Sequence, residues 1–153
     1  MSDDVRIVEA TAGPLAVVRA SRIAPPELGA TIMASLDKVY ALLRGRGMGG
    51  LGHNVVVYRV GPPPWDIEIG VQTPSPIAPE GEVVASETPA GRAATAVHWG
   101  AYDRLHETHQ KIHVWCRANG FKLGAYNWEL YGDWFDDPAK VRTDVFYLVE
   151  EVA

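Results

Sequence analysis

Two stretches of equal length, residues 44–58 (RGRGMGGLGHNVVVY) and residues 117–131 (RANGFKLGAYNWELY), carry the same four residues at the same spacing. Each begins with Arg-x-x-Gly, and seven residues after that glycine comes Asn-x-x-x-Tyr. Helical periodicity precedes each stretch and strand-forming residues follow each glycine, so each marks the end of a helix and the strand after it. A motif that recurs in the same order predicts a duplicated unit.

The flanking sequence places the same kinds of element around both copies. Apolar alternation, glycine and proline predict the order strand, strand, helix, strand, strand in each half. The expected strands are Val5–Glu9, Leu15–Ala20, Asn54–Val60, Trp65–Val71, Glu82–Glu87, Arg92–Trp99, Ala125–Tyr131 and Thr143–Glu150. The expected helices are one that Pro25-Pro26 opens, with apolar residues recurring from Leu28 to Leu43, and one at Tyr102–Ala118.

These elements predict an α+β fold. We expect duplicated βαββ units, about residues 5–73 and 81–152, which form a mostly antiparallel sheet with two main helices and a central cleft. Val5–Glu9 is then a short leader strand, and the proline-rich loop Thr73–Gly81 joins the two units. We expect residues 1–153 to form one domain, because this length suits a single hydrophobic core.

Composition and charge exclude several classes of protein. The formal net charge is −5 and the Lys and Arg residues are scattered singly, so we expect no direct binding to nucleic acid or to an anionic membrane surface. Cys116 is the only cysteine, which excludes an internal disulfide. The acidic start does not resemble a signal peptide and no apolar stretch reaches the ~20 residues of a membrane span, so we expect a cytoplasmic location. Dinucleotide-binding, phosphate-loop and Gly-x-Ser-x-Gly patterns are absent, and we expect no cofactor.

The aromatic segment Tyr126–Tyr131 holds the main candidate for a ligand-binding residue. Alternation along a strand puts Asn127, Glu129 and Tyr131 on one face. Glutamate is rare in strands and costly to bury unpaired, and the counterpart of Glu129 in the first copy is Val56. Glu129 is therefore either the carboxylate at the floor of an aromatic pocket for a cationic ligand, or a structural residue that faces solvent or a tyrosine hydroxyl.

Other aromatic and acidic side chains are further candidates. Trp65 and Trp99 lie at strand ends, where pockets are often built, although core and rim packing explains most aromatic residues. Glu68 is a second candidate acid on the polar face of its strand, with a solvated surface glutamate as the alternative.

Three histidines share one side of the second helix. His106, His109 and His113 fall within about 60° of one another on an ideal helix, and a His-x-x-x-His pair can chelate a metal. No carboxylate shares that stretch of helix surface, and no cysteine pair is present. We therefore expect no metal site, and interpret these residues as a solvated helix flank with His109 at the edge of the core.

The second half, read in order, resembles the GyrI-like or effector-binding domain family of bacterial transcription activators. The residues that carry the resemblance are Val97–Asp103 (VHWGAYD), Trp115, Asn119-Gly120-Phe121, Trp128-Glu129-Leu130-Tyr131 and Asp136-Asp137-Pro138. In the first half, Trp65–Val71 is also similar to a strand of the family. Ala101 stands where the family usually has proline, and Gly52-His53-Asn54 also departs from the pattern.

The resemblance implies two βαββ units around a cleft that accepts hydrophobic, often cationic, drugs and dyes. It implies that the acid at the position of Glu129 faces the ligand. The ligand-binding residues that we expect around it are Trp65, Glu68, Trp99, Tyr102, Trp128, Tyr131 and Tyr147. Many relatives are fused to a helix-turn-helix domain, for which 153 residues leave no room, so we expect a stand-alone form.

Three functions follow from the resemblance. The first is the binding of hydrophobic, cationic or aromatic small molecules, for multidrug sequestration or effector sensing. The second is the hydrolysis of cyclopropane-bearing alkylating compounds, in which Glu129 would orient or deprotonate water while Trp128, Tyr131 and Tyr147 hold a flat substrate. The third is a protein-interaction module of the gyrase-inhibitor type, with a protein partner.

Overall fold

The computed structural model describes residues 4–152, and within that range it has eight strands and two α-helices. The elements of the first half are β1 (Arg6–Ala10), β2 (Pro14–Ile23), a 3-10 turn (Pro25–Glu27), α1 (Leu28–Gly45), β3 (Asn54–Arg59) and β4 (Trp65–Gln72). Those of the second half are β5 (Val83–Glu87), β6 (Gly91–Trp99), a 3-10 turn (Tyr102–Arg104), α2 (Leu105–Ala118), β7 (Phe121–Tyr131), a 3-10 turn (Pro138–Lys140) and β8 (Arg142–Glu151). The predicted α+β fold is confirmed, and each predicted strand and helix has a counterpart.

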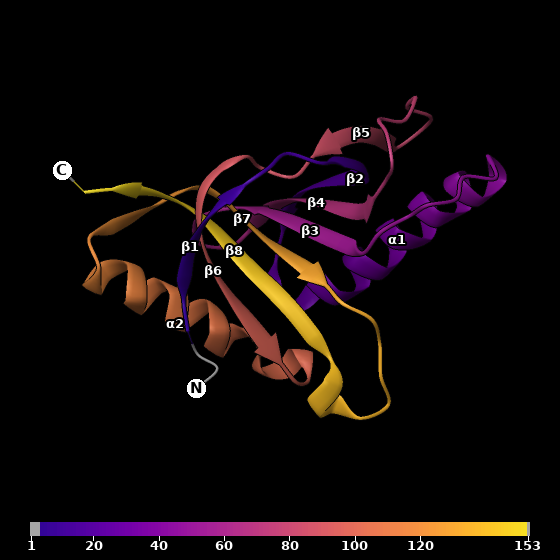
Figure 1. Cartoon of the computed structure of the whole chain (residues 1–153). Helices are drawn as coiled ribbons and strands as arrows, with labels where there is room; N and C mark the ends of the chain where they lie inside the picture. Colours follow the sequence, from indigo (N-terminus) through magenta and orange to yellow (C-terminus); the bar gives the residue numbers. More distant parts are fainter. Residues whose placement is uncertain (1–3, 153) are drawn as a thin grey trace.

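All eight strands form one sheet in the order β1-β6-β8-β7-β3-β4-β2-β5 (Figure 1). Every neighbouring pair is antiparallel. The strands of the second half occupy one side of the sheet and those of the first half occupy the other, except for the two edge strands. Those edge strands have exchanged places.

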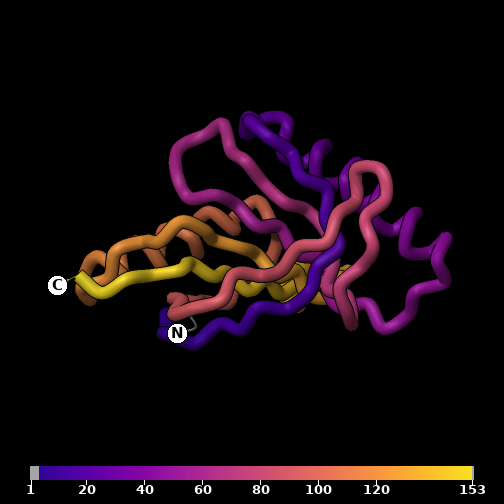
Figure 2. Tube along the Cα trace, turned by 90° about the horizontal axis from the view of Figure 1, so that it is seen from above, coloured from indigo at the N-terminus to yellow at the C-terminus, as the bar shows by residue number. Residues whose placement is uncertain are grey.

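The first strand of each half pairs with the other half. β1 pairs with β6, beside which its indigo trace runs in Figure 2, and β5 pairs with β2. The turns that follow these strands also meet, since the Gly13 amide donates to Thr88 Oγ1 at 2.9 Å and the Thr88 amide donates to the Gly13 carbonyl at 3.0 Å. This arrangement is what a duplicated unit with exchanged first strands would produce.

The repeated sequence motif meets itself at the centre of the sheet. In the β3–β7 pair, Asn54 lies opposite Tyr131 and Tyr58 lies opposite Asn127. Midway between these pairs, Val56 lies opposite Glu129. A pseudo-two-fold axis therefore passes between Val56 and Glu129. The acid beside this axis, Glu129, comes from the second half, and its counterpart from the first half is a valine.

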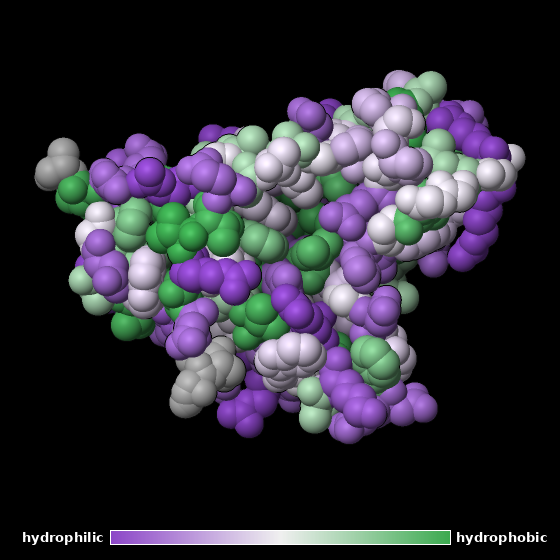
Figure 3. Space-filling view, in the orientation of Figure 1, coloured by the Kyte–Doolittle hydropathy of each residue, from purple (hydrophilic) through white to green (hydrophobic). Residues whose placement is uncertain are grey.

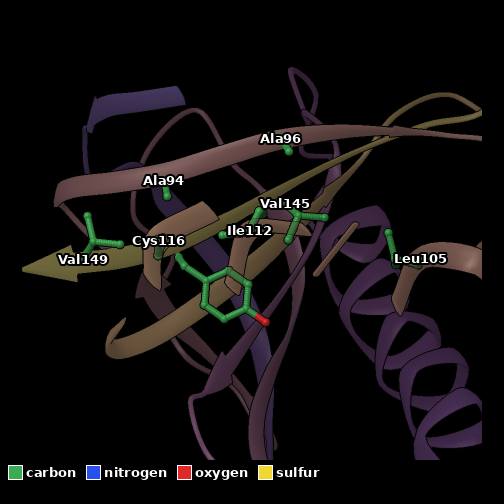
Figure 4. Packing of buried hydrophobic residues seen from close by; sticks show 8 residues of the cluster. Ala94, Ala96, Leu105, Ile112, Cys116, Val145 and Val149 are labelled. Carbon is green, nitrogen blue, oxygen red and sulfur yellow. The ribbon is translucent and has the colours of Figure 1, made fainter. Parts of the chain in front are cut away.

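Each helix packs on the strands of its own half. α1 packs on β2 and β4, and its core-facing Val39 and Leu43 are fully buried. α2 packs on β6 and β7, and Ile112 and Cys116 form one cluster with residues of β6 and β8 (Figure 4). Burial raises the pKa of the Cys116 thiol, which suits a structural role for this cysteine.

A second apolar layer lies on the face of the central strands that points away from the helices. Trp128 of β7 is buried there beside Val55 of β3, and its ring stacks on Phe146 at a centroid distance of 5.0 Å. Val8 of the edge strand β1 and Val84 of the edge strand β5 pack against the same cluster. The exchanged edge strands therefore help to cover this face.

The surface mixes polar and apolar side chains. Hydrophilic residues are spread over the view in Figure 3, with smaller apolar patches between them. None of the helices within residues 4–152 is both long and apolar enough to cross a membrane.

Strand β7 begins at Phe121, four residues before its predicted start. Its pairing with β8 shifts between Leu123 and Asn127, so the strand contains an irregularity there. Gly124 lies within this segment, where an added Cβ would come within 3.0 Å of Leu148 Cβ. The irregular pairing breaks the strict alternation on which the prediction relied.

Candidate functional site

A cleft of about 1200 Å³ lies between the two helices. Its walls are the facing sides of α1 and α2, and its floor is formed mainly by the central strands β3 and β7. Both helices pack on the same face of the sheet and leave the middle of that face uncovered. The cleft is therefore located at the pseudo-two-fold axis. Its volume is more than enough for a drug-sized ligand.

The Glu129 side chain lies at the floor of this cleft, with the residue only 4% exposed. Its Oε1 accepts hydrogen bonds from the hydroxyl groups of Tyr131 and Tyr58, the latter at 3.2 Å. Its Oε2 lies 2.6 Å from Nε2 of His109, which reaches down from α2. Three donors from three elements therefore converge on one buried carboxylate.

His109 connects this carboxylate to a third tyrosine. Its Nδ1 lies 2.6 Å from the Tyr147 hydroxyl of β8, and the two rings meet edge to face with centroids 5.5 Å apart. The tautomer with its proton on Nε2 satisfies both contacts: it donates to Glu129, and Nδ1 accepts from Tyr147.

The network keeps the tyrosines protonated. Burial raises the pKa of Tyr58 and of Tyr131, and the nearby negative charge of Glu129 raises both further. Tyr147 has a raised pKa for the same two reasons. All three hydroxyls are therefore protonated at neutral pH. Those of Tyr58 and Tyr131 donate to the carboxylate and offset the cost of burying it, while that of Tyr147 contacts His109.

Aromatic rings continue from the floor to the rim of the cleft. Trp65 packs edge to face on Tyr58 at 6.0 Å, and Tyr102 packs edge to face on Tyr131 at 5.6 Å. Trp134 lies 6.2 Å from Tyr102 and is 69% exposed. Such rings present flat apolar faces to a ligand and attract cations.

The model of the GyrI-like small molecule binding domain matches residues 66–150, more than half of the chain. The chain belongs to this family. The predicted family membership is thereby confirmed, and the family is one of small-molecule-binding domains.

Solved structures share the fold of this GyrI-like domain. The C-terminal domain of EcmrR superposes with a TM-score of 0.78 at 19% identity, covering 97% of this chain and 98% of that one. A hydrolase encoded by lin2189 from Listeria innocua gives 0.68 at 9% identity, covering 97% and 93%. SAV2435, in a structure bound to tetraphenylphosphonium, gives 0.67 at 12% identity, covering 96% and 94%. No curated protein sequence matches the chain.

Five of the predicted site residues line the cleft of this GyrI-like domain. They come from β4, the turn before α2, β7 and β8, and they are Trp65, Tyr102, Glu129, Tyr131 and Tyr147. Their convergence follows from the fold, because β7 is the central strand and its neighbours present alternate side chains to the same face.

Three predicted site residues lie elsewhere, and for these the expectation of a shared cleft is corrected. Trp128 is adjacent to Glu129 in β7 and therefore points to the opposite face, where it is buried. Trp99 lies at the end of β6, 52% exposed, with the Arg142 guanidinium 5.5 Å from its ring centre. Glu68 also faces away from the cleft, where it accepts from Arg19 Nε at 2.8 Å.

Sequence reasoning missed two members of the network. Tyr58 carries a signal that could have found it, because it is the equivalent of Tyr131 in the repeated Asn-x-x-x-Tyr motif. The sequence places His109 only at the edge of the core. Its contacts with Glu129 and Tyr147 depend on the position of α2 over the sheet. His98, which is buried, is structural: its ring nitrogens contact Thr108 Oγ1 at 3.0 Å and the Ala101 carbonyl at 2.9 Å.

The other histidines of α2 also face the cleft. His106 and His113 line its wall, and Nε2 of His113 is buried without a hydrogen-bond partner. Burial lowers the pKa of His113, with His109 and Arg117 as further causes, so it is neutral at physiological pH. Within residues 4–152, no group of three or more His, Cys, Asp or Glu side chains is placed to hold a metal ion.

Proposed function

We propose that this GyrI-like domain binds hydrophobic small molecules that carry a positive charge or a large aromatic surface, with the Glu129 carboxylate as the counter-charge. The proposal rests on one observation: the Glu129 carboxylate is buried at the floor of an open, aromatic-lined cleft, where two tyrosine hydroxyls and His109 contact it. A carboxylate in such a place is costly for folding, and a ligand cation would recover part of that cost.

The surroundings of Glu129 suit a soft, bulky cation better than a small hydrated ion. The carboxylate is covered by Tyr58 and Tyr131, so a cation would approach it across the edges and faces of their rings. Rings attract cations that have lost part of their water, and large organic cations lose it at little cost. SAV2435, which shares the fold, has been solved with the lipophilic cation tetraphenylphosphonium.

A fluorescence titration with rhodamine 6G tests this proposal. We expect saturable binding by the wild type and an affinity reduced on the order of tenfold or more in Glu129→Gln, because a charge–charge interaction at low dielectric is lost. Glu68→Gln is the matched control, since it removes a carboxylate from the opposite face and should leave the affinity unchanged. Equal affinities for all three proteins would contradict the role of Glu129.

Hydrolysis in the same cleft is the second candidate function, and the coordination of Glu129 favours it. A carboxylate offers about four acceptor positions, and three of them are used by Tyr58, Tyr131 and His109. The remaining position could hold a water molecule next to a bound substrate, so that Glu129 acts as a general base. A protein of this fold from Listeria innocua is described as a hydrolase.

The two candidate functions differ in what Glu129→Gln does. Incubation with a cyclopropane-bearing alkylating compound, followed by chromatography of the product, measures turnover directly. A hydrolase loses turnover in Glu129→Gln while the substrate still binds, whereas a binding protein returns the compound unchanged with either variant.

A further inference from the structure

The two walls of the cleft are equivalent in position but different in chemistry. The shared residues Arg44 and Arg117 near the helix ends set an offset of 73 residues between α1 and α2. With this offset the buried residues of the helices coincide: Ser35 with Thr108, Val39 with Ile112, and Leu43 with Cys116. Equivalent residues therefore occupy equivalent positions over the two halves of the sheet.

The three histidines of the α2 wall have less polar counterparts on α1. With the same offset, His106, His109 and His113 correspond to Met33, Leu36 and Tyr40, and all six line the cleft. The floor shows the same difference. Glu129 lies opposite Val56, and Tyr147 pairs with Asn127 as Val71 pairs with Asn54. The whole Glu129–His109–Tyr147 network is thus replaced by Val56, Leu36 and Val71 in the other half.

We infer that the cleft selects two-part ligands and binds them in one orientation. The cationic head lies over Glu129 on the α2 side, and an apolar tail lies along the α1 wall. This inference rests on the proposed function, because it takes Glu129 as the counter-charge. It adds that the α1 wall, and not the aromatic rim alone, determines which cations bind.

Burial and solvation favour this orientation over the reverse. A charged head against Met33 and Leu36 of the α1 wall would lose its water without gaining a partner. A tail against the exposed His106 would bury polar ring nitrogens in the same way. Met33 on the α1 wall is 62% exposed, so an apolar side chain is available there for a tail to cover.

The cleft is also larger than a head group needs. At about 1200 Å³ it exceeds the usual range for drug-sized ligands. A small ammonium ion at Glu129 would leave the α1 half of this volume to water. An attached alkyl chain would displace that water from the apolar wall, and its affinity would increase with chain length.

Calorimetric titration with n-alkyltrimethylammonium ions of increasing chain length, below micelle-forming concentrations, tests the orientation. For the wild type we expect affinity to rise with each added CH₂ by up to about fourfold. Met33→Gln and Leu36→Gln should flatten this dependence, with the smallest effect on the shortest ion. Because Met33 is exposed, its variant remains informative if Leu36→Gln folds poorly.

Val114→Gln provides the matched control. Val114 is an exposed apolar residue on the opposite wall of the same cleft, so its change should not alter the dependence on chain length. Glu129→Gln should weaken all ions of the series by the same factor, because the charge is bound at the floor of the cleft and the tail is bound on the α1 wall.

Two results would overturn the inference. A dependence on chain length that survives Met33→Gln and Leu36→Gln, or that Val114→Gln reduces equally, would contradict the assigned orientation while leaving cation binding at Glu129 intact. An absence of binding by every ion of the series and by rhodamine 6G would overturn the proposed function as well.

Discussion

Nε2 of His109 lies 2.6 Å from Oε2 of Glu129, and this contact joins helix α2 to the central strand of the sheet. It stabilises a buried carboxylate whose counterpart in the first half of the chain is the apolar Val56. The contact therefore links the stability of the domain to the chemistry of its cleft.

Replacement of His109 by leucine, the residue at the equivalent position of α1, should destabilise the domain. The change keeps an apolar helix face but removes one of three donors from Glu129, which should cost about 1–3 kcal/mol. Urea unfolding at neutral pH measures the loss. His106→Leu changes an exposed histidine of the same helix and should stay within about 0.5 kcal/mol of the wild type. Equal stability of the two variants would show that the contact contributes little.

Stability should fall at high pH because of the buried tyrosines. The pKa values of Tyr58, Tyr131 and Tyr147 are raised in the folded protein, whereas an unfolded tyrosine ionises near pH 10. Below that pH both states are protonated and the three residues add no pH dependence. Above it the unfolded state loses protons first, so the free energy of unfolding decreases as pH rises.

Unfolding by urea at a series of pH values from 9 to 11 measures this decrease. Tyr147→Phe should make the slope shallower, because one of the three ionisations is removed. A free energy of unfolding that stays constant across this range in the wild type would contradict the raised pKa values.

Removal of the positive charge of Arg117 should strengthen cation binding. Arg117 lines the cleft at the α2 end, where it opposes a bound cation. It is exposed, so we expect only about a twofold to threefold gain in affinity for rhodamine 6G from Arg117→Gln at low salt. The gain should disappear at high salt because of screening. Weaker binding of rhodamine 6G by this variant at low salt would contradict the repulsion between Arg117 and the bound cation.

Substitution of Gly70 by alanine should strongly destabilise the sheet. An added Cβ would lie 1.7 Å from the Ala16 carbonyl oxygen, which is a backbone atom and cannot move without separating β2 from β4. We expect a loss of roughly 3 kcal/mol or more in thermal or urea unfolding. Gly45→Ala in α1 meets no atom within 4 Å and should be neutral or stabilising. Similar melting temperatures for the two variants would contradict the close approach at Gly70.

Much of the fold could be predicted because its signals are local. Pro25-Pro26 and the glycines after Arg44 bracket α1, and the alternation of Ile67, Ile69 and Val71 marks β4. The repeated motif around Tyr58 and Tyr131 also predicted a duplicated unit. The exchange of β1 and β5 was not predicted, because the partner of a strand is decided by distant residues and by how the sheet closes.

The candidate site was predicted only in part for the same reason. Glu129 could be singled out because a glutamate in an aromatic strand is unusual. Trp128 and Tyr147 were both predicted to bind the ligand. Which of them faces the cleft depends on which face of each strand the helices cover. The role of His109 required the position of α2 over the sheet, since its partners Glu129 and Tyr147 are 20 and 38 residues away.

The location of a bound cation is the sharpest test of the proposed role of Glu129. Isotope-filtered NMR of the labelled protein with tetraphenylphosphonium measures which side chains lie next to its phenyl protons. We expect nuclear Overhauser contacts to Tyr58, Tyr131 and Trp65, and their loss in Glu129→Gln at the same ligand concentration. Contacts to Tyr126 and Trp128 instead would place the cation on the opposite face of the sheet and contradict the account.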